Sequence, residues 1–129
     1  VFSWTAIINA YVDDGKAHKA LQLHQSMCEE GVEPNGYTYV SLLKACTDSC
    51  NLEKGKILHM EARKKSLSSN AIVNSTLLGM YGKCGAVREA EDAFYASSQH
   101  DIVLWTSMLC VYVENGEARK ALLLYRQMQ

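Results

Sequence analysis

Apolar side chains recur along the chain at intervals of three and four residues, and short polar breaks separate these stretches. Such spacing is typical of helices that bury one face. The pattern predicts helices over 4–13, 17–29, 39–48, 52–65, 74–83, 87–96, 105–114 and from 118 to the chain end. Three breaks contain Gly15, Gly85 and Gly116, and glycine tolerates the positive φ that ends a helix. Cys50 takes the place of glycine after the third helix, so a different turn is expected there.

The predicted helices belong to an internal repeat. A displacement of 101 residues places Trp4 on Trp105, Tyr11 on Tyr112 and Gly15 on Gly116. The same displacement matches Lys19, Ala20, Leu21, Leu23 and Met27 with Lys120, Ala121, Leu122, Leu124 and Met128. It divides into 35, 35 and 31 residues, which gives units 1–35, 36–70, 71–101 and an incomplete unit 102–129. Each unit contains two predicted helices.

Positions that are equivalent in the repeat share size and character. One position is always small, with Ala20, Gly55, Ala90 and Ala121, which allows the two helices of a unit to approach closely. Another is always a ring, with His24, His59, Phe94 and Tyr125, which favours packing over metal binding for the histidines. A single hairpin cannot bury both its faces, so the units are expected to stack. The expected fold is an all-α, right-handed α-solenoid whose first helices line a concave surface.

Composition excludes several classes of protein. No apolar run is long enough to span a membrane, and a net charge of −1 is unlike that of a strongly basic nucleic-acid binder. The cysteines are odd in number and irregularly spaced, which indicates neither a disulfide framework nor a zinc site: Cys28, Cys46, Cys50, Cys84 and Cys110. The sequence has no glycine-rich phosphate loop, no GxSxG and no zinc deaminase signature, so we expect no catalytic centre, metal or cofactor.

The period and its residues resemble the pentatricopeptide repeat. The resemblance covers the whole chain and rests on Trp4, Tyr11, Gly15, Ala20-Leu21, Met27, Gly31 and Pro34-Asn35. The units resemble the P, L and S types of the plant PLS class followed by part of another P unit. The L-like unit carries Leu42-Leu43-Lys44-Ala45-Cys46, and the S-like unit carries Met80-Tyr81-Gly82-Lys83-Cys84-Gly85. The tetratricopeptide repeat is a poorer match, because it has a uniform period of 34 and a glycine where Ile8, Leu43, Leu78 and Leu109 stand.

The resemblance implies which residues contact single-stranded RNA, one base per unit. The fifth and last residues of a unit would read the base, which pairs Thr5 with Asn35, Val40 with Asn70 and Ser75 with Asp101. Thr106 has no partner, because the chain stops at Gln129. The second residues would stack on bases: Phe2, Tyr37, Ile72 and Val103. Of the thirteenth residues only Lys83 could contact phosphate, since Asp13, Asp48 and Glu114 are acidic.

The chemistry of the last residue predicts base preferences. An asparagine amide can donate to the bare ring nitrogen of adenine or cytosine, whereas an aspartate can only accept from the ring N–H of guanine or uracil. The small hydroxyls of Thr5 and Ser75 leave room for a purine. By resemblance, unit one would take adenine and unit three guanine, and Val40 would leave unit two undiscriminating. On the residues alone, Asn35 and Asp101 could be turn residues and Thr5 and Ser75 helix-start hydroxyls.

The expected function is sequence-specific binding of single-stranded RNA within a plant organellar RNA editing or processing factor. The family implies a chloroplast or mitochondrial location, editing-complex proteins as partners, and a deaminase-like domain elsewhere in the full protein. Two alternatives are a scaffold that binds a protein or peptide in the same groove and, last, an all-helical enzyme. No signal or transit peptide is visible, and the chain looks like part of a longer one. Both ends of such a stack would expose apolar surface, so head-to-tail self-association is expected.

Overall fold

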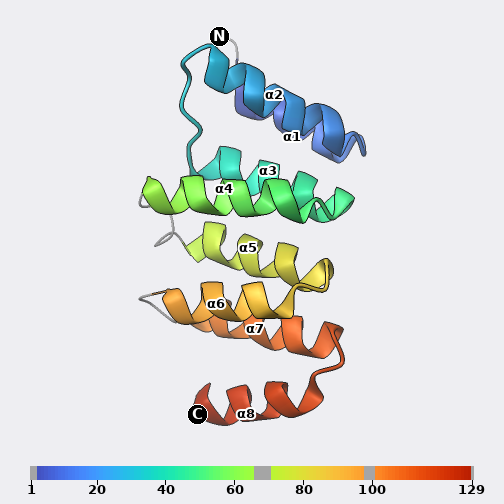
Figure 1. Ribbon diagram of the computed structural model, residues 1–129, viewed down its shortest axis with the longest axis vertical. Coiled ribbons are helices and arrows are strands. Elements are labelled where there is room, and N and C mark those ends of the chain that lie inside the picture. Colours follow the sequence, from blue (N-terminus) through green and yellow to red (C-terminus); the bar gives the residue numbers. More distant parts are fainter. Residues whose placement is uncertain (1–2, 66–70, 98–100, 129) are drawn as a thin grey trace.

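The computed structural model describes residues 3–65, 71–97 and 101–128, and these residues form helices without any strand. The helices are α1 (Trp4–Asp13), α2 (Ala17–Glu29), α3 (Gly36–Ser49), α4 (Leu52–Lys64), α5 (Ala71–Lys83), α6 (Val87–Ala96), α7 (Ile102–Glu114) and α8 (Ala118–Met128). They stack in chain order along one long axis, with the two chain ends at opposite ends of the stack (Figure 1). The predicted all-α solenoid is therefore confirmed, and the chain does not close into a bundle.

Three of the first helices begin three residues earlier than the apolar pattern predicted. Asn35 caps α3, where its side chain accepts a hydrogen bond from the backbone N–H of Thr38 at 2.9 Å. Asp101 caps α7 in the same way, accepting from the N–H of Leu104 at 2.9 Å. These caps satisfy N–H groups that have no partner inside the helix, so the helix begins one turn before the stretch that hydrophobic periodicity marked. For α5 the preceding residue lies outside the described part of the chain.

The turn inside each hairpin has one geometry in all four hairpins. Gly15, Gly85 and Gly116 have φ of 76°, 76° and 73°, and Cys50 also lies in the left-handed region with φ of 49°. The next residue donates its N–H to a carbonyl five residues back, for example Lys16 to Tyr11 at 2.8 Å. In the second hairpin the corresponding bond is slightly longer, 3.1 Å from Asn51 to Cys46. The turn therefore survives the loss of glycine, but a side chain occupies a backbone conformation that glycine adopts more easily.

Packing between hairpins is concentrated in one layer. The first helices contact each other directly along the chain, α1 with α3, α3 with α5 and α5 with α7. Among the described residues, consecutive second helices make at most marginal contact with each other. Each of α2, α4 and α6 instead contacts the first helix of its own hairpin and that of the next hairpin. The first helices thus form the closely packed inner layer and the second helices a wider outer layer, which is the arrangement predicted for a curved stack.

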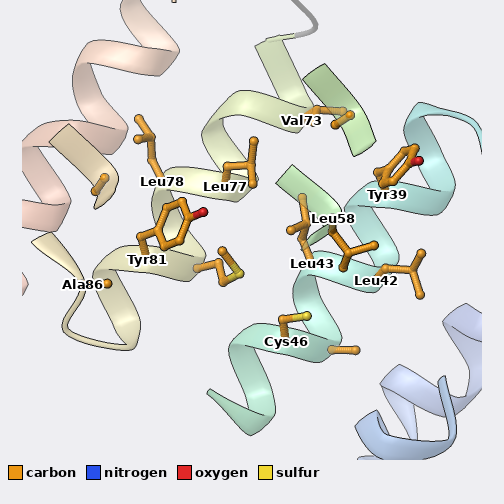
Figure 2. Close-up of a cluster of buried hydrophobic side chains, with 14 of the residues drawn as sticks. Tyr39, Leu42, Leu43, Cys46, Leu58, Val73, Leu77, Leu78, Tyr81 and Ala86 are labelled. Carbon is orange, nitrogen blue, oxygen red and sulfur yellow. The ribbon is translucent and has the colours of Figure 1, made fainter. Parts of the chain in front are cut away.

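The core is continuous from one hairpin to the next. Figure 2 shows side chains of α3, α4 and α5 meeting in one cluster, among them Tyr39, Leu43, Leu58 and Leu77, all of them 1% exposed or less. Burial of each such side chain contributes roughly 1.5–3 kcal/mol relative to exposure. Leu58 of α4 therefore stabilises the contact with the following hairpin as well as its own hairpin.

The small residue at the position of Gly55 makes room for the next hairpin. A Cβ atom there would lie 2.4 Å from Sδ of Met80 in α5, and 3.9 Å from Cβ of Cys46 in its own hairpin. The closest approach is therefore to the following unit, whereas the sequence suggested an approach within the hairpin. In this unit the small side chain serves the stacking of units more than the closing of one unit.

Polar side chains of the second helices contact the neighbouring hairpin. His59 Nδ1 lies 3.1 Å from the Tyr81 hydroxyl of the next hairpin, and the Tyr112 hydroxyl donates to Glu91 at 2.7 Å. His24 is 2% exposed, and its Nε2 lies 3.5 Å from Oε2 of Glu61, whereas its Nδ1 has no hydrogen-bond partner among the described residues. Both histidines occupy the packing position predicted from the repeat.

We expect Cys50→Gly to stabilise the chain. Glycine removes the steric cost of the left-handed conformation, which exceeds the extra entropy that glycine loses on folding, so the free energy of unfolding should rise by about 0.5–1 kcal/mol. Gly15→Ala is the matched control, because φ is 76° there and a Cβ would meet nothing within 4 Å. That control should lower the free energy of unfolding by about 1 kcal/mol. Urea unfolding measures both, and a destabilised Cys50→Gly variant would contradict the prediction.

His24→Phe should make stability less sensitive to acid. Burial, followed by the charge of Lys54, lowers the pKa of His24 in the folded chain, although Glu61 opposes this; burial and then Arg63 lower that of His59. Since the unfolded chain takes up protons more readily, stability should fall as pH drops below about 6.5. Phenylalanine occupies the equivalent position at residue 94, so the variant should fold. Its stability should still decrease in acid, but by less, because His59 remains. Urea midpoints at about pH 5 and about pH 7.5 measure it. If the difference between the two urea midpoints were the same with and without the substitution, His24 would not contribute to the loss of stability in acid.

Candidate nucleic-acid interface

The inner layer of first helices carries two clefts. We name them by the helix ends at which they lie. The N-terminal cleft has a volume of about 220 Å³ and is lined by Asn35, Gly36, Tyr37, Val40 and Ile72. The C-terminal cleft has a volume of about 400 Å³ and is lined by Val12, Asp13, Lys44, Thr47, Asp48, Thr76, Gly79, Met80 and Lys83. Eight residues separate the fifth from the thirteenth position of a unit, which corresponds to about 12 Å along a helix. The N-terminal cleft thus lies near the starts of α3 and α5, and the C-terminal cleft lies near the ends of α1, α3 and α5.

Apolar side chains stand out from the surface at the N-terminal cleft. Tyr37 is 76% exposed and Ile72 is 59% exposed, although both are large apolar residues, and both line the same cleft. Val103, the equivalent residue of the fourth unit, is 50% exposed. Phe2, the fourth predicted stacking residue, lies outside the described part of the chain. An apolar side chain that is exposed at the same position of consecutive units is available to pack against the flat face of a ring.

The first predicted reading pair is joined by hydrogen bonds. The Thr5 hydroxyl lies 2.7 Å from the Thr38 hydroxyl, which in turn lies 2.9 Å from Oδ1 of Asn35. The backbone N–H of Asn35 also points to the Thr38 hydroxyl, at 3.3 Å. Thr38 is fully buried, whereas Asn35 is exposed and Thr5 is half-buried. The structure therefore brings Thr5 and Asn35 together through a residue of the following unit.

The third unit is arranged differently. Asp101 is exposed and uses Oδ1 to cap α7, while the Ser75 hydroxyl donates to the backbone carbonyl of Ile72 at 3.1 Å. Leu104 stands where Thr38 stands in the second unit, so no hydroxyl is available to connect the two. Both reading residues are accessible, but no described hydrogen bond joins them.

The remaining reading residues are only partly described. Val40 is half-buried and lines the N-terminal cleft, where it offers no hydrogen bond. Asn70, its predicted partner, lies outside the described residues. Thr106 is exposed, and its hydroxyl donates to the carbonyl of Ile102 at 2.7 Å. Neither Thr5 nor Ser75 caps a helix, so the alternative interpretation of these two hydroxyls as helix-start caps is wrong. Asn35 and Asp101 do act as caps.

The C-terminal cleft brings together charges of both signs. Lys83 shares it with Asp13 and Asp48, the thirteenth residues of the two preceding units. Lys44 lies there too and is exposed, although the sequence did not single it out. It occupies the ninth position of its unit, equivalent to Asn9, Gly79 and Cys110, so no repeated charge marked it. Two lysines and two aspartates leave this cleft close to neutral, in agreement with the balanced composition.

Neither a metal site nor a membrane span emerges from the described residues. Within 3–65, 71–97 and 101–128, no three histidine, cysteine or acidic side chains are placed to hold a metal ion. In the same ranges no helix is both long and apolar enough to cross a bilayer. The cysteines are free thiols, and burial raises the pKa of Cys46 to about 11, which disfavours the reactive thiolate.

Comparison with known proteins identifies the repeat. Residues 1–48 match the PPR repeat family, and residues 75–96 and 103–129 match the PPR repeat. A chloroplastic pentatricopeptide repeat-containing protein of Arabidopsis thaliana is 43% identical over 127 residues, which is 98% of this chain and 21% of that protein. A mitochondrial one from the same plant is 34% identical over 126 residues, covering 98% of this chain and 14% of that protein. Another pentatricopeptide repeat-containing protein of this plant is 35% identical over 127 residues, which is 98% of this chain and 18% of that protein. The chain thus spans about a fifth or less of these relatives, and it belongs to the pentatricopeptide repeat family.

Proposed function

We propose that the chain binds single-stranded RNA along its inner layer, with one base for each of the units 1–35, 36–70, 71–101 and 102–129. The observation that supports this most directly is the N-terminal cleft. Tyr37 and Ile72, from consecutive units, line it while remaining exposed, and Asn35 lies at its edge with an unburied amide. A flat base can stack on such side chains while its edge meets a polar group. Apolar side chains that are exposed next to each other in one cleft, with a polar group beside them, are typical of a binding site.

The bases would be distinguished by the fifth and the last residue of each unit. Asn35 with Thr5 favours adenine, and Asp101 with Ser75 favours guanine, because the amide can donate and the carboxylate can only accept. Val40 leaves unit two without a hydrogen bond from that position. The target is then a purine, any base and a purine at consecutive positions.

Affinity of this chain alone should be low. Four stacked bases contribute about 4–12 kcal/mol at roughly 1–3 kcal/mol each, while association and ordering cost about 4–15 kcal/mol. The C-terminal cleft adds little, because Asp13 and Asp48 offset Lys44 and Lys83 near the expected phosphates. Binding should therefore be weak and depend little on salt, and a longer array would add the contributions of further units.

The names of the relatives support a location in a plant organelle. Proteins named as chloroplastic and as mitochondrial are among them, so we place this chain in one of those plant organelles. The lengths of its units fit the PLS class. We propose that it addresses an RNA editing or processing factor to its transcript, with editing-complex proteins as partners and any chemistry supplied outside these residues.

Asn35→Asp should change the base preference of unit one from adenine toward guanine. Asparagine and aspartate both cap helices in this chain, at Asn35 and Asp101, so the fold should be retained. The amide NH₂ group that could donate to a base would be replaced by a carboxylate oxygen, which can only accept. The ratio of dissociation constants for 5′-AUGU and 5′-GUGU should change by about tenfold. Nuclear magnetic resonance titration of the 129-residue chain can measure such weak binding, with the reversed oligonucleotides included to fix strand direction.

Asn51→Asp is the matched control for this change. It makes the same substitution at another helix cap, where Asn51 accepts from the N–H of Lys54 at 3.2 Å, away from both clefts. It should leave the base preference unchanged. An equal loss of affinity for both RNAs in Asn35→Asp would indicate a general charge effect and would contradict base reading by this residue.

We also propose that the chain associates head to tail. Leu122 and Leu123 of α8 are 63% and 52% exposed, and α8 packs mainly against α7. These residues border a shallow apolar depression between Arg119 and Arg126 that another hairpin could cover. Sedimentation velocity over a hundredfold range of concentration should show a rising sedimentation coefficient. A monomer at every concentration would contradict the proposal.

A further inference from the structure

We propose that Thr38, the third residue of the second unit, sets the hydrogen-bonding character of the reading pair in the first unit. In this role it is a positioning residue, because it is buried behind Thr5 and Asn35 and acts through them. The inference rests on the proposed function, since it assigns a cause to the base preference of unit one. It predicts that Thr5 accepts from the base and that Asn35 donates to it.

The orientation of the Asn35 amide is fixed by the backbone. The N–H of Thr38 can only donate, and it lies 2.9 Å from the amide atom that faces it. That atom must be the oxygen Oδ1, because the amide nitrogen has no lone pair to accept with. The NH₂ group is consequently the part of the side chain that is turned away from the start of α3.

The direction of the hydroxyl bonds then follows. The Thr38 hydroxyl lies 2.9 Å from Oδ1 of Asn35, and since Oδ1 can only accept, Thr38 must donate its single proton there. The 2.7 Å contact between the two hydroxyls can therefore be a hydrogen bond only if Thr5 donates to Thr38. The backbone N–H of Asn35 supplies a second donor to the Thr38 oxygen at 3.3 Å. When both short contacts are hydrogen bonds, this is the only arrangement of the protons.

This order determines what the pair offers a base. Thr5 has used its proton on Thr38, so its oxygen can only accept from a ligand, while the NH₂ group of Asn35 can only donate. The complementary edge carries an amino group beside a bare ring nitrogen. Adenine and cytosine have that edge, and guanine and uracil do not, because their ring nitrogen carries a proton.

The other units lack this device. The residues equivalent to Thr38 in the third and fourth units are Val73 and Leu104, which have no hydroxyl. There the Ser75 hydroxyl donates to the carbonyl of Ile72 instead. The chain therefore contains both a coupled pair and an uncoupled pair on one scaffold, and only the coupled pair should depend on the third residue of the following unit.

The test is Thr38→Val, compared with Thr38→Ser. Valine keeps the branched shape, and Val73 is fully buried at the equivalent position, so the variant should fold. It removes the hydroxyl that bonds Thr5 and one of the two hydrogen bonds that Thr38 donates to Oδ1 of Asn35. The preference for 5′-AUGU over 5′-GUGU should fall roughly two- to tenfold, while Thr38→Ser should keep it. Ser49→Ala in the same helix, whose hydroxyl bonds the carbonyl of Ala45, is a control that should change nothing.

A chemical probe separates this role from a purely structural one. Replacing the adenine with purine riboside removes the amino group that Thr5 would accept from, so the effect of Thr38→Val should shrink on that RNA. Urea unfolding of each variant establishes that the chain remains folded. If Thr38→Val weakened all RNAs equally, Thr38 would be only part of the helix cap and the inference would be wrong.

The outcomes also distinguish this inference from the proposed function. If Asn35→Asp shifts the base preference and Thr38→Val leaves it intact, the inference fails and the proposed function stands. If neither substitution alters the preference, or if no RNA binds even at millimolar concentration, base reading by this pair fails, and the inference fails with it.

Discussion

The contact of each first helix with the next first helix is the constraint on which the rest of the structure depends. A hairpin of two helices has apolar side chains on more than one face, and only a neighbouring hairpin can cover the second face. Leu58 and Gly55 illustrate this, because both meet residues of α5 in the following unit. Direct packing of α1, α3, α5 and α7 then places equivalent positions of successive units in rows. The two clefts exist because rows of side chains, rather than single residues, line this layer.

Rows of weak contacts also explain how a nearly neutral chain could hold a polyanion. The C-terminal cleft contains as many aspartates as lysines, so attraction to phosphate is not its main contribution. Stacking at exposed residues such as Tyr37 and Ile72 does not depend on charge. In the proposed mode of binding, specificity would come from polar atoms at the edge of each site, and affinity would grow with the number of sites.

The repeat allowed most of the fold to be predicted from the sequence. Hydrophobic periodicity located every helix, and the repeated ring position identified the packing role of His24 and His59. The small residue at Gly55 was expected to serve its own hairpin and instead makes room for the next one. Hydrophobic periodicity missed the first turn of α3, α5 and α7; in α3 and α7 that turn is set by the side-chain caps Asn35 and Asp101, which such periodicity does not detect. Family resemblance selected Thr5 and Asn35, which the structure brings together, but Thr38 could not be found that way. Thr38 forms a buried hydrogen bond with Thr5 of the preceding unit, and neither spacing nor composition reveals that these two hydroxyls meet.

Asn35, the last residue of the first unit, caps α3 through its Oδ1 and also lines the N-terminal cleft. This restricts how such a protein can evolve a new target. Asparagine, aspartate, serine and threonine can all start a helix, whereas an apolar replacement costs about 1 kcal/mol of stability before any RNA is met. New targets are therefore most accessible through exchanges among these few side chains. If this residue reads a base as proposed, each exchange would alter the atom presented to that base and leave the scaffold intact. The residues available for recognition would then be limited to those that can begin a helix.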